Sequence, residues 1–261
     1  MRDNKVAVER QKEIYSLIKQ SGTVRVTNLS KRFKVTTETI RRDLEQMERD
    51  GLLHRMHGGA YLEQPGKDDN TLVLRNKENK SAESFLSIAA EAAKLVEHGD
   101  IIGLDSSVIS YQLAKRLINQ DITVITNSIL VTSEFLNSKS SKVKVITVGG
   151  YLNKDSSSFV GNMSEKLLET YNVDKFFFSC SGFHIDHGVF ENDELEAQVK
   201  YKFTTISDKS FLMADHTRFG EKSLTSFMKL NKLELVILDQ NIALHNLASL
   251  KNNGINVHVA K

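Results

Sequence analysis

Two adjacent arginines, Arg41 and Arg42, follow Glu38 at helical spacing in the N-terminal quarter of the chain. At about 100° per residue, Arg42 and Glu38 point away from the apolar face of the predicted helix, and Arg41 lies on its flank. That apolar face is formed by Ile40, Leu44 and Met47. Guanidinium groups held on the free face of a packed helix are suited to contact phosphates and guanine edges.

The segment that precedes these arginines predicts a second, shorter helix and a tight turn. Thr36 is the predicted N-cap of the arginine helix, and Thr27 is the predicted cap of the helix before it. The turn at 33–35 is short enough to hold the two helices at a large angle, which is the geometry of a helix-turn-helix. Asp43, beside the packed face, is predicted to be a structural ion-pair or hydrogen-bond partner.

An amphipathic helix with two arginines is more often an ordinary solvated surface helix, so the neighbouring segments decide between the readings. A further helix is predicted over 6–20, ending at Gly22. After the arginine helix, Gly51 stops the helical pattern, and 52–62 predict two short strands that turn near His57. With Arg55 and the histidines at its edge, this hairpin would be a wing that contacts the DNA backbone or minor groove.

The same residues carry a resemblance to a known family. Thr-Ile-Arg-Arg-Asp-Leu at 39–44, Gly-Leu-Leu at 51–53 and Arg-Met-His-Gly-Gly-Ala at 55–60 resemble the signature of DeoR-family bacterial transcription regulators. The resemblance covers about 6–62 and implies that the second helix enters the major groove. The expected DNA contacts are Thr37, Glu38, Thr39, Arg41 and Arg42, with Arg55, His57 and Gly58 on the wing.

Composition and charge fit an N-terminal nucleic-acid module. The 261 residues allow two domains, and 40% hydrophobic with 26% charged residues is ordinary for a globular protein. Residues 1–62 hold 13 Lys+Arg against 8 Asp+Glu, a net of +5, whereas the remainder holds 22 against 25, a net of −3. A single cysteine, Cys180, excludes an internal disulfide and is predicted to be core filler. No signal peptide or membrane span is evident, so we expect a cytoplasmic protein.

The remaining sequence predicts a separate α/β domain. A linker at 63–76 contains the only proline, Pro65, and the second domain is expected to run over 77–261. It begins with a helix over 77–97 and continues as apolar strands that alternate with helices, which favours a three-layer domain with a largely parallel sheet. The predicted strands are 101–104, 124–125, 143–146, 175–180, 210–214, 235–238 and 256–259.

Polar residues follow several of these strands, where the carboxyl ends of a parallel sheet collect ligands. This part of the chain resembles the DeoR-family effector domain, which is similar in fold to ribose-5-phosphate isomerases and CoA transferases, and the resemblance implies a phosphorylated sugar as effector. The candidate effector-binding residues are Asp105, Ser106, Ser107, Asn127, Gly149, Gly150, Lys175, Glu196, Lys200, Asp215 and Arg218.

Several features qualify this assignment. The loop Asp105-Ser-Ser-Val-Ile109 replaces the family's usual Asp-Ser-Gly-Thr-Thr, and Arg218 replaces its usual lysine. Glu196 and Lys200 also have the spacing of an ordinary surface ion pair. His184, Asp186 and His187 are read as a polar loop rather than a metal site, and no cofactor is predicted.

Two functions remain open from the sequence. The first is a homo-oligomeric transcription regulator, expected to be a repressor of a sugar-metabolism operon that a phosphorylated sugar relieves. The second is a sugar-phosphate isomerase-like enzyme with a DNA-binding head, in which Glu196, Lys200 and Asp215 would transfer protons. The DNA-reading motif and the altered phosphate loop favour the regulator, so no catalytic residue is assigned.

Overall fold

The structure is a computed structural model that describes residues 10–18, 23–50, 52–56, 59–61, 83–138 and 142–261. The chain separates into two compact units, Met1–Asp68 and Asp69–Lys261. The predicted linker at 63–76 lies outside the described residues. None of the described helices is both long enough and apolar enough to cross a bilayer.

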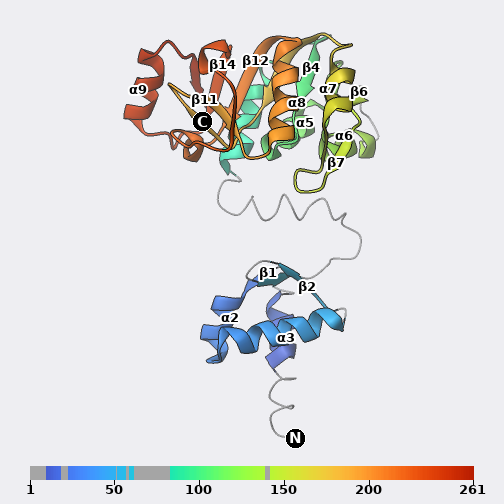
Figure 1. Ribbon diagram of the computed structural model, residues 1–261, viewed down its shortest axis with the longest axis vertical. Coiled ribbons are helices and arrows are strands. Elements are labelled where there is room, and N and C mark those ends of the chain that lie inside the picture. The colour runs from blue at the N-terminus through green and yellow to red at the C-terminus, as the bar shows by residue number, and fades with distance from the viewer. Residues whose placement is uncertain (1–9, 19–22, 51, 57–58, 62–82, 139–141) are drawn as a thin grey trace, which may run out of the picture. The chain divides into compact units, whose positions relative to one another are not determined.

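The N-terminal unit is a small helical bundle with a three-stranded antiparallel sheet (Figure 1). Residues 10–18 are helical, and the rest of the helix predicted over 6–20 lies outside the described residues. The unit continues with β1 (Thr23–Arg25), α2 (Val26–Phe33), α3 (Thr37–Arg49), β2 (His54–Met56) and β3 (Gly59–Tyr61). The sheet has the order β1-β3-β2, so the predicted wing hairpin is confirmed.

Two local features of this unit differ from the sequence analysis: one strand was missed and one predicted helix cap was wrong. Strand β1 was not predicted, because its three residues are defined by pairing with β3, from Thr23↔Tyr61 to Arg25↔Gly59. Helix α2 begins at Val26, directly after that strand, so Thr27 lies inside the helix and does not cap it. The core that joins the three helices to the wing consists of Ile14, Ile18, Val26, Leu29, Ile40, Leu44, Met47, Leu53 and Ala60.

The second unit is built on a seven-stranded sheet in which every neighbouring pair is parallel. The strand order is β15-β14-β12-β9-β4-β5-β6. The strands are β4 (Ile101–Leu104), β5 (Thr123–Thr126), β6 (Lys144–Thr147), β9 (Val173–Phe178), β12 (Ser207–Ala214), β14 (Leu235–Leu238) and β15 (Val257–Val259). All seven predicted strands are therefore confirmed, and so is the parallel sheet.

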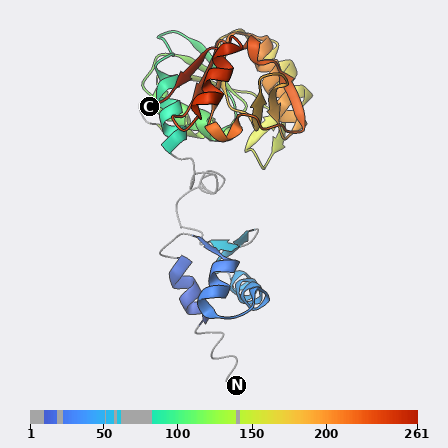
Figure 2. The same cartoon turned by 90° about the vertical axis from the view of Figure 1, so that its left-hand side faces the viewer.

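Helices cover both faces of this sheet and produce the predicted three layers (Figure 1, Figure 2). One face packs against the helix at 83–93, α5 (Val108–Leu117) and α6 (Ile129–Asn137). The other packs against α7 (Asn162–Leu168), α8 (Glu194–Thr205) and α9 (Leu244–Asn252). Successive phenylalanines of β9 point to opposite faces of the sheet. Phe177 packs in the core beside α5 and α6, whereas Phe176 and Phe178 pack in the core beside α7 and α8.

Shorter elements complete the unit. They are the antiparallel hairpin β7 (Tyr151–Asn153) and β8 (Ser158–Val160), the antiparallel sheet β10 (Gly182–His184), β11 (Gly188–Glu191) and β13 (Thr225–Met228), and two single turns of 3-10 helix, η1 (His216–Arg218) and η2 (Leu230–Lys232).

The described part of the helix predicted over 77–97 ends at residue 93, so its predicted end was too late.

Candidate functional sites

Helix α3 buries one face and exposes the other, as its sequence pattern predicts. The backbone N–H of Thr39 donates to the hydroxyl of Thr36 at 3.1 Å, which confirms Thr36 as the N-cap. The apolar face of Ile40, Leu44 and Met47 is buried in the core of the unit. The opposite face is therefore free to meet a large ligand such as a duplex.

Arg41 and Arg42 lie on that exposed face. Their side chains are 58% and 78% exposed, and Glu38 contacts them at 3.5 and 3.7 Å. Exposed ion pairs of this kind contribute little free energy, so a phosphate or a base edge can replace Glu38 at small cost. Thr37 and Thr39 lie in the first turn of the same helix, where a recognition helix reads bases.

The wing residues are described only in part. Arg55 pairs with Ala60 in the β2–β3 ladder, which places its backbone in the hairpin. The Arg55 side chain, together with all of His57 and Gly58, lies outside the described residues. The expected DNA contacts of these three residues remain predictions.

Asp43 is a structural partner, as predicted. It is buried on α3, and the guanidinium of Arg10 binds both of its carboxylate oxygens, with Nε to Oδ2 at 2.5 Å and Nη2 to Oδ1 at 3.1 Å. This bidentate pair fixes the helix at 10–18 against α3.

Replacing Asp43 with alanine is expected to lower the opening free energy of α3 by about 3 kcal/mol, because the Arg10 guanidinium loses its buried partner. Hydrogen–deuterium exchange of the α3 amides in the full chain measures this change. Arg10→Ala should cost a similar amount, and the double variant little more than either single one. Fully additive losses would show that the two side chains stabilise the unit independently.

In the second unit, the strand order places a switch point between β4 and β9. The chain proceeds from β4 to β5 and β6 in one direction, and then returns to β9 on the other side of β4. At such a point the connections leave the sheet toward opposite faces and open a crevice beyond the carboxyl ends of the strands. Asp105 follows β4 at this position, and Ser179 follows β9.

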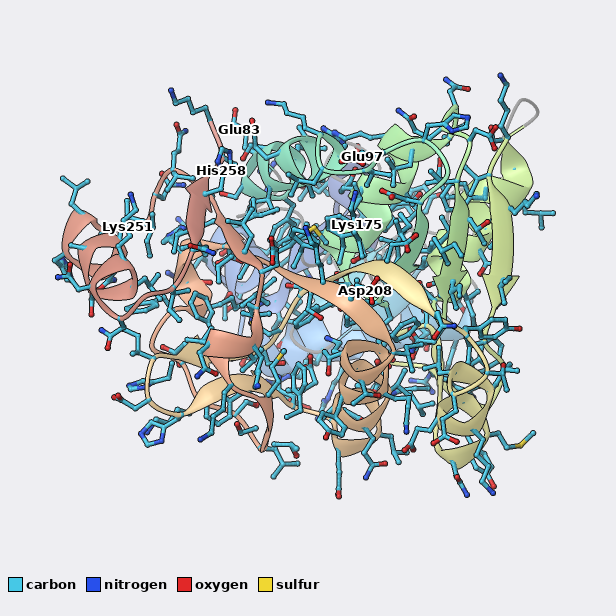
Figure 3. The ribbon with its side chains drawn as sticks, turned by 90° about the horizontal axis from the view of Figure 1, so that it is seen from above. Glu83, Glu97, Lys175, Asp208, Lys251 and His258 are labelled. Atoms are coloured by element: carbon cyan, nitrogen blue, oxygen red, sulfur yellow. The ribbon has the colours of Figure 1, made fainter. Side chains whose placement is uncertain are left out.

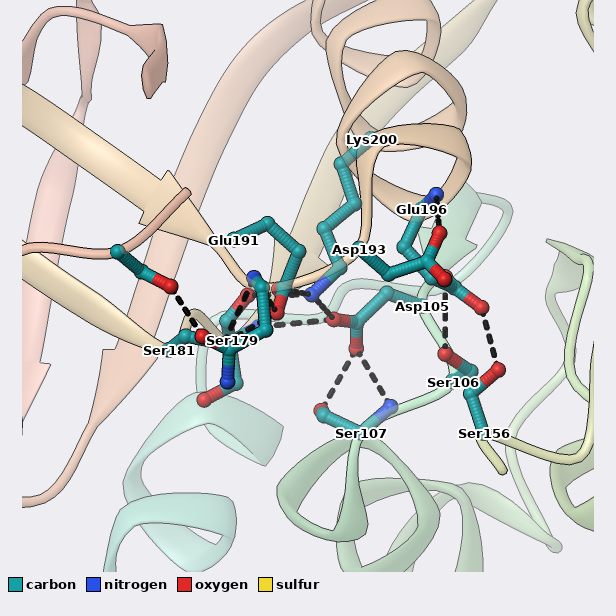
Figure 4. A network of polar contacts seen from close by, with 12 residues as sticks. Asp105, Ser106, Ser107, Ser156, Ser179, Ser181, Glu191, Asp193, Glu196 and Lys200 are labelled. Carbon is teal, nitrogen blue, oxygen red and sulfur yellow. Dashed lines mark hydrogen bonds and ion pairs between the residues drawn. The ribbon is translucent and has the colours of Figure 1, made fainter. Parts of the chain in front are cut away.

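Asp105 joins four elements beyond the strand ends (Figure 4). Its Oδ1 accepts from the Ser107 hydroxyl at 2.6 Å and the Ser110 hydroxyl at 2.5 Å, both on α5 or its cap. Its Oδ2 accepts from the backbone N–H of Ser179 at 3.0 Å and lies 3.1 Å from Nζ of Lys200 on α8. With 1% exposure, Asp105 lies beneath the crevice and organises its floor.

Lys200 is buried among acceptors. Its ammonium contacts Glu191 at 2.5 Å, Asp105 at 3.1 Å and the carbonyl of Ser179 at 2.9 Å. Burial alone would lower the pKa of Lys200, but the carboxylates of Glu191 and Asp105 outweigh burial and raise it. Burial likewise opposes ionisation of Glu191, yet Lys200 holds the pKa of that carboxyl below its ordinary value. The charged forms therefore persist at neutral pH.

Glu196 lies one helical turn before Lys200 and is also buried. Its carboxylate accepts from Ser156 at 2.6 Å, from Ser106 at 3.2 Å and from Ser158 (Figure 4). Glu196 and Lys200 therefore do not form the exposed ion pair that their spacing also allowed. Each side chain is buried and binds partners of its own. Glu196 ties the β7–β8 hairpin to the loop after β4.

Residues that follow β12 form another wall of the crevice. Asp215 caps η1 by accepting from the Thr217 backbone N–H at 2.9 Å. Nη1 of Arg218 donates to the carbonyl of Ser181 at 3.1 Å, and its Nε lies 3.7 Å from Asp215. The Arg218 side chain remains 39% exposed and faces the crevice.

These walls enclose a cavity of about 590 Å³, a size that admits a small metabolite. Six predicted residues line it: Ser106, Ser107, Glu196, Lys200, Asp215 and Arg218. Its lining also includes residues that the sequence did not single out, among them Asn153, Ser156, Glu191 and Asp193. Glu191 comes from β11 and Ser156 from the loop of the β7–β8 hairpin, so neither follows a strand of the parallel sheet.

Three other predicted residues support the walls without lining the cavity. Nδ2 of Asn127 donates to the carbonyl of Phe159 at 3.0 Å and so holds β8 against the end of β5. The carbonyl of Gly149 accepts from Ser164 at 2.8 Å. A Cβ at Gly150 would lie 2.1 Å from Oγ of Ser164, so only glycine fits there. These contacts are structural, and the expected ligand contacts of the three residues remain predictions.

Lys175 lies away from the other predicted residues. It occupies the start of β9, so it is at the amino edge of the sheet, opposite the crevice. Its ammonium contacts Asp100 at 2.8 Å, the carbonyl of Leu95 at 2.9 Å and Glu97 at 3.6 Å. Figure 3 labels Lys175 and Glu97. The expectation that Lys175 binds the same ligand as Lys200 is therefore not supported, although a second, open cavity of about 720 Å³ lies beside it.

Cys180 is buried, as predicted, at the margin of the 590 Å³ cavity. Burial raises the pKa of its thiol to about 12. Since only the thiolate is nucleophilic, we expect the folded chain to react with iodoacetamide at pH 8 on the order of a thousandfold more slowly than the unfolded chain. Mass spectrometry of the time course measures both rates. Equal rates would show that the thiol is open to solvent.

Among the described residues, no group of three or more His, Cys, Asp or Glu side chains is arranged to hold a metal ion. His184 instead accepts from the backbone N–H of Asp186 at 3.2 Å within the turn after β10.

The chain thus combines a winged helix-turn-helix unit, a fold typical of DNA-binding proteins, with an α/β unit whose cavity has charged and hydroxyl side chains in its lining. The sequence matches the family model described as the DeoR-like helix-turn-helix domain over residues 10–65, and that described as the DeoR C terminal sensor domain over residues 80–240. The chain belongs to the DeoR family of transcriptional regulators, which confirms the resemblance found in the sequence.

Full-length relatives agree with this assignment. The chain is 35% identical to the uncharacterized HTH-type transcriptional regulator YulB of Bacillus subtilis, over 97% of this chain and 96% of that protein. It is 32% identical to the L-fucose operon activator of Haemophilus influenzae, over 89% and 92%. It is 30% identical to the lactose phosphotransferase system repressor of Staphylococcus aureus, over 88% and 91%. All three are named as regulators: a transcriptional regulator, an operon activator and a repressor.

Proposed function

We propose that this protein controls a carbohydrate operon by binding its operator through α3 and the wing, and that a phosphorylated sugar in the 590 Å³ cavity releases it from DNA. The cavity at the β4/β9 switch point is the observation that carries this proposal, because its buried ionic floor and hydroxyl-rich walls suit a small polyhydroxyl anion. One relative is named for the lactose phosphotransferase system and another for the L-fucose operon, which supports a sugar-related effector; the first is a repressor and the second an activator. We expect the protein to act as a repressor, to form a homo-oligomer and to work in the cytoplasm, where its operator DNA is.

The charges of the cavity indicate where the phosphate would bind. Lys200 is already neutralised by Asp105 and Glu191, so among the described lining residues Arg218 is the more accessible cation. The N-terminus of α5 opens on the same cavity and offers backbone N–H groups. A phosphate between Arg218 and α5 would leave the sugar hydroxyls near Glu196 and its serines.

Hydrogen bonds connect this cavity to the first described helix of the second unit, at 83–93. Phe85 lines the cavity from the first described turn of the helix at 83–93. The neighbouring Ser84 donates to Asp239 at 2.8 Å, and Asp239 also accepts from the backbone N–H of His216 at 2.6 Å. His216 lies within η1, whose flanking residues Asp215 and Arg218 face the cavity. Ligand contacts at η1 would thereby bias the helix that follows the linker.

Thermal shift of the full chain with a panel of pentose and hexose phosphates, each paired with the free sugar, tests this function. A ligand at about 100 times its dissociation constant adds about 2.7 kcal/mol to stability, so we expect a rise of several degrees for one sugar phosphate. Arg218→Ala should remove the rise while keeping the unliganded midpoint. A rise with the free sugar that Arg218→Ala preserves would exclude the phosphate contact.

A further inference from the structure

The cavity of about 720 Å³ beside Lys175 lies at the amino edge of the parallel sheet, at the opposite end of the strands from the proposed sugar-phosphate site. Four neighbouring strands, β9, β12, β14 and β15, each contribute a residue near their amino end to its lining. These residues are Lys175, Lys209, Leu235 and Val257. Figure 3 shows this edge of the second unit with Lys175 and Lys251 labelled. The proposed function gives this cavity no role.

Two of its lysines lie side by side on neighbouring strands. Lys175 and Lys209 are direct partners in the ladder between β9 and β12. Two positions further along, the partners Phe177 and Phe211 stack with their ring centroids 4.8 Å apart, so the two lysines also point to one face of the sheet. Like charges held opposite each other on neighbouring strands repel and lower stability. A bound anion would offset this repulsion.

Positive charge predominates in the described lining of this cavity. Four lysines and two glutamates give it a net charge of +2, and they are Lys94, Lys175, Lys209, Lys251, Glu97 and Glu234. Residues 63–261 carry a net charge of −3, so the lysines are concentrated here against the balance of that part of the chain. A concave site with an excess of one charge attracts ligands of the opposite charge.

The lysines differ in how far they are already paired. The Lys175 side chain is 13% exposed and binds Asp100 at 2.8 Å, so it is mainly a fixed charge within the wall. Lys209 is 51% exposed and meets Glu234 only at 3.6 Å. Lys251, in the last turn of α9, has no ion-pair partner among the described residues. Lys209 and Lys251 are therefore the cations that an incoming anion can bind at small cost.

The same cavity also has an apolar lining, which consists of Leu95, Phe211, Leu235, Ile255 and Val257. We infer that it binds an organic phosphate of nucleotide size, with the phosphates at Lys209 and Lys251 and an apolar or aromatic part against this lining. A volume of about 720 Å³ lies within the range of small-molecule sites. A sugar phosphate alone would leave the apolar lining uncovered.

The helix at 83–93 extends from the first cavity to this one. Phe85, in its first described turn, lines the 590 Å³ cavity, and Leu95, in the turn that follows its last residue, lines the 720 Å³ cavity. An organic phosphate at the amino edge would thus act on the same helix as the proposed sugar phosphate, and the chain would combine two signals. The second site itself does not depend on the first.

Isothermal titration calorimetry of the full chain with ATP and with pyrophosphate, in magnesium-free buffer, tests this site. We expect ATP to bind more tightly than pyrophosphate, because only ATP can also cover the apolar lining, and both to bind more weakly as the salt concentration rises. Lys209→Ala and Lys251→Ala should each weaken ATP binding by at least about tenfold. Lys166→Ala on α7, outside the lining of both cavities, is the charge-matched control.

Thermal unfolding without ligand separates binding from folding. Lys209→Ala removes a like charge opposite Lys175, so this variant should be at least as stable as the parent although it loses ATP. Lys209→Gln, which keeps most of the side-chain stem, should behave in the same way. A clear loss of stability in both Lys209 variants would show that the lysine is a structural residue and would overturn its role in the site.

Three binding results would also overturn the inference. They are no heat of binding with ATP up to about 5 mM, equal affinities for ATP and pyrophosphate, and an ATP affinity that both lysine variants retain. Arg218→Ala, which disables the proposed sugar-phosphate site, should still bind ATP as the parent does. Loss of ATP binding in that variant would place ATP in the first cavity, so the two sites are tested separately.

Discussion

Replacing Asp105 with alanine is expected to lower the unfolding free energy of the second unit by about 3–5 kcal/mol, the usual cost of removing one partner from a buried ion pair. Asp105 is 1% exposed and joins β4, α5, β9 and α8 through Ser107, Ser179 and Lys200. Its loss leaves the Lys200 ammonium buried with an excess donor and frees the loop at the cavity floor. We expect the response to the effector to be lost with it.

Urea unfolding of the full chain, followed by circular dichroism, measures the effect on stability. Ser107→Ala is the graded control, because it removes one hydrogen-bond donor to Asp105 and one helix cap, at about 1 kcal/mol each. The separate N-terminal unit should keep its affinity for DNA in the Asp105 variant. A loss of less than 1 kcal/mol would show that water replaces the carboxylate and that the network is not a structural floor.

The double variant Arg41→Ala, Arg42→Ala is expected to weaken operator binding by about 2–4 kcal/mol, or roughly thirtyfold to a thousandfold, because each arginine contributes a phosphate or base contact. Both side chains are exposed on α3 and contact Glu38 at 3.5 and 3.7 Å, and exposed ion pairs of this kind contribute little to stability. Fluorescence anisotropy with labelled operator measures the loss at several salt concentrations, and the slope of log affinity against log salt should fall.

The single variants separate the two roles. If Arg42 reads a guanine, Arg42→Ala should also relax the preference for operator over unrelated DNA, whereas loss of a phosphate contact weakens both equally. Arg116→Ala, a charge-matched change on the exposed side of α5 in the second unit, is the control. Unchanged affinity in the double variant would remove α3 from the DNA interface.

Sequence patterns predicted the elements whose formation depends on residues close together in the chain. The 3.6-residue period of Ile40, Leu44 and Met47 and the cap at Thr36 are contained within α3, so they could be read directly. The apolar runs of the parallel strands were equally clear, because central strands are buried on both faces, as the three phenylalanines of β9 show.

Elements that depend on distant pairing could not be read in this way. Strand β1 is three residues long and exists through its ladder with β3, and the β7–β8 hairpin has a polar, serine-rich loop without strand alternation. Ser156 and Glu191 reach the cavity on such elements, so the sequence did not reveal them. Lys175 was grouped with the crevice residues on the family resemblance, whereas the structure places it near the start of β9, at the amino edge of the sheet. Its predicted ligand contact remains a prediction.

The central claim is that one chain joins operator recognition by α3 to metabolite sensing at the β4/β9 cavity. Selection of fragments from the protein's own genome, followed by footprinting of the enriched fragment with and without each sugar phosphate, tests both halves together. We predict that the protein protects one DNA segment at low ionic strength and that a single sugar phosphate removes this protection. The Arg218→Ala variant should still protect the segment when that sugar phosphate is present. Absence of any enriched fragment, or protection that no sugar phosphate alters, would contradict the account.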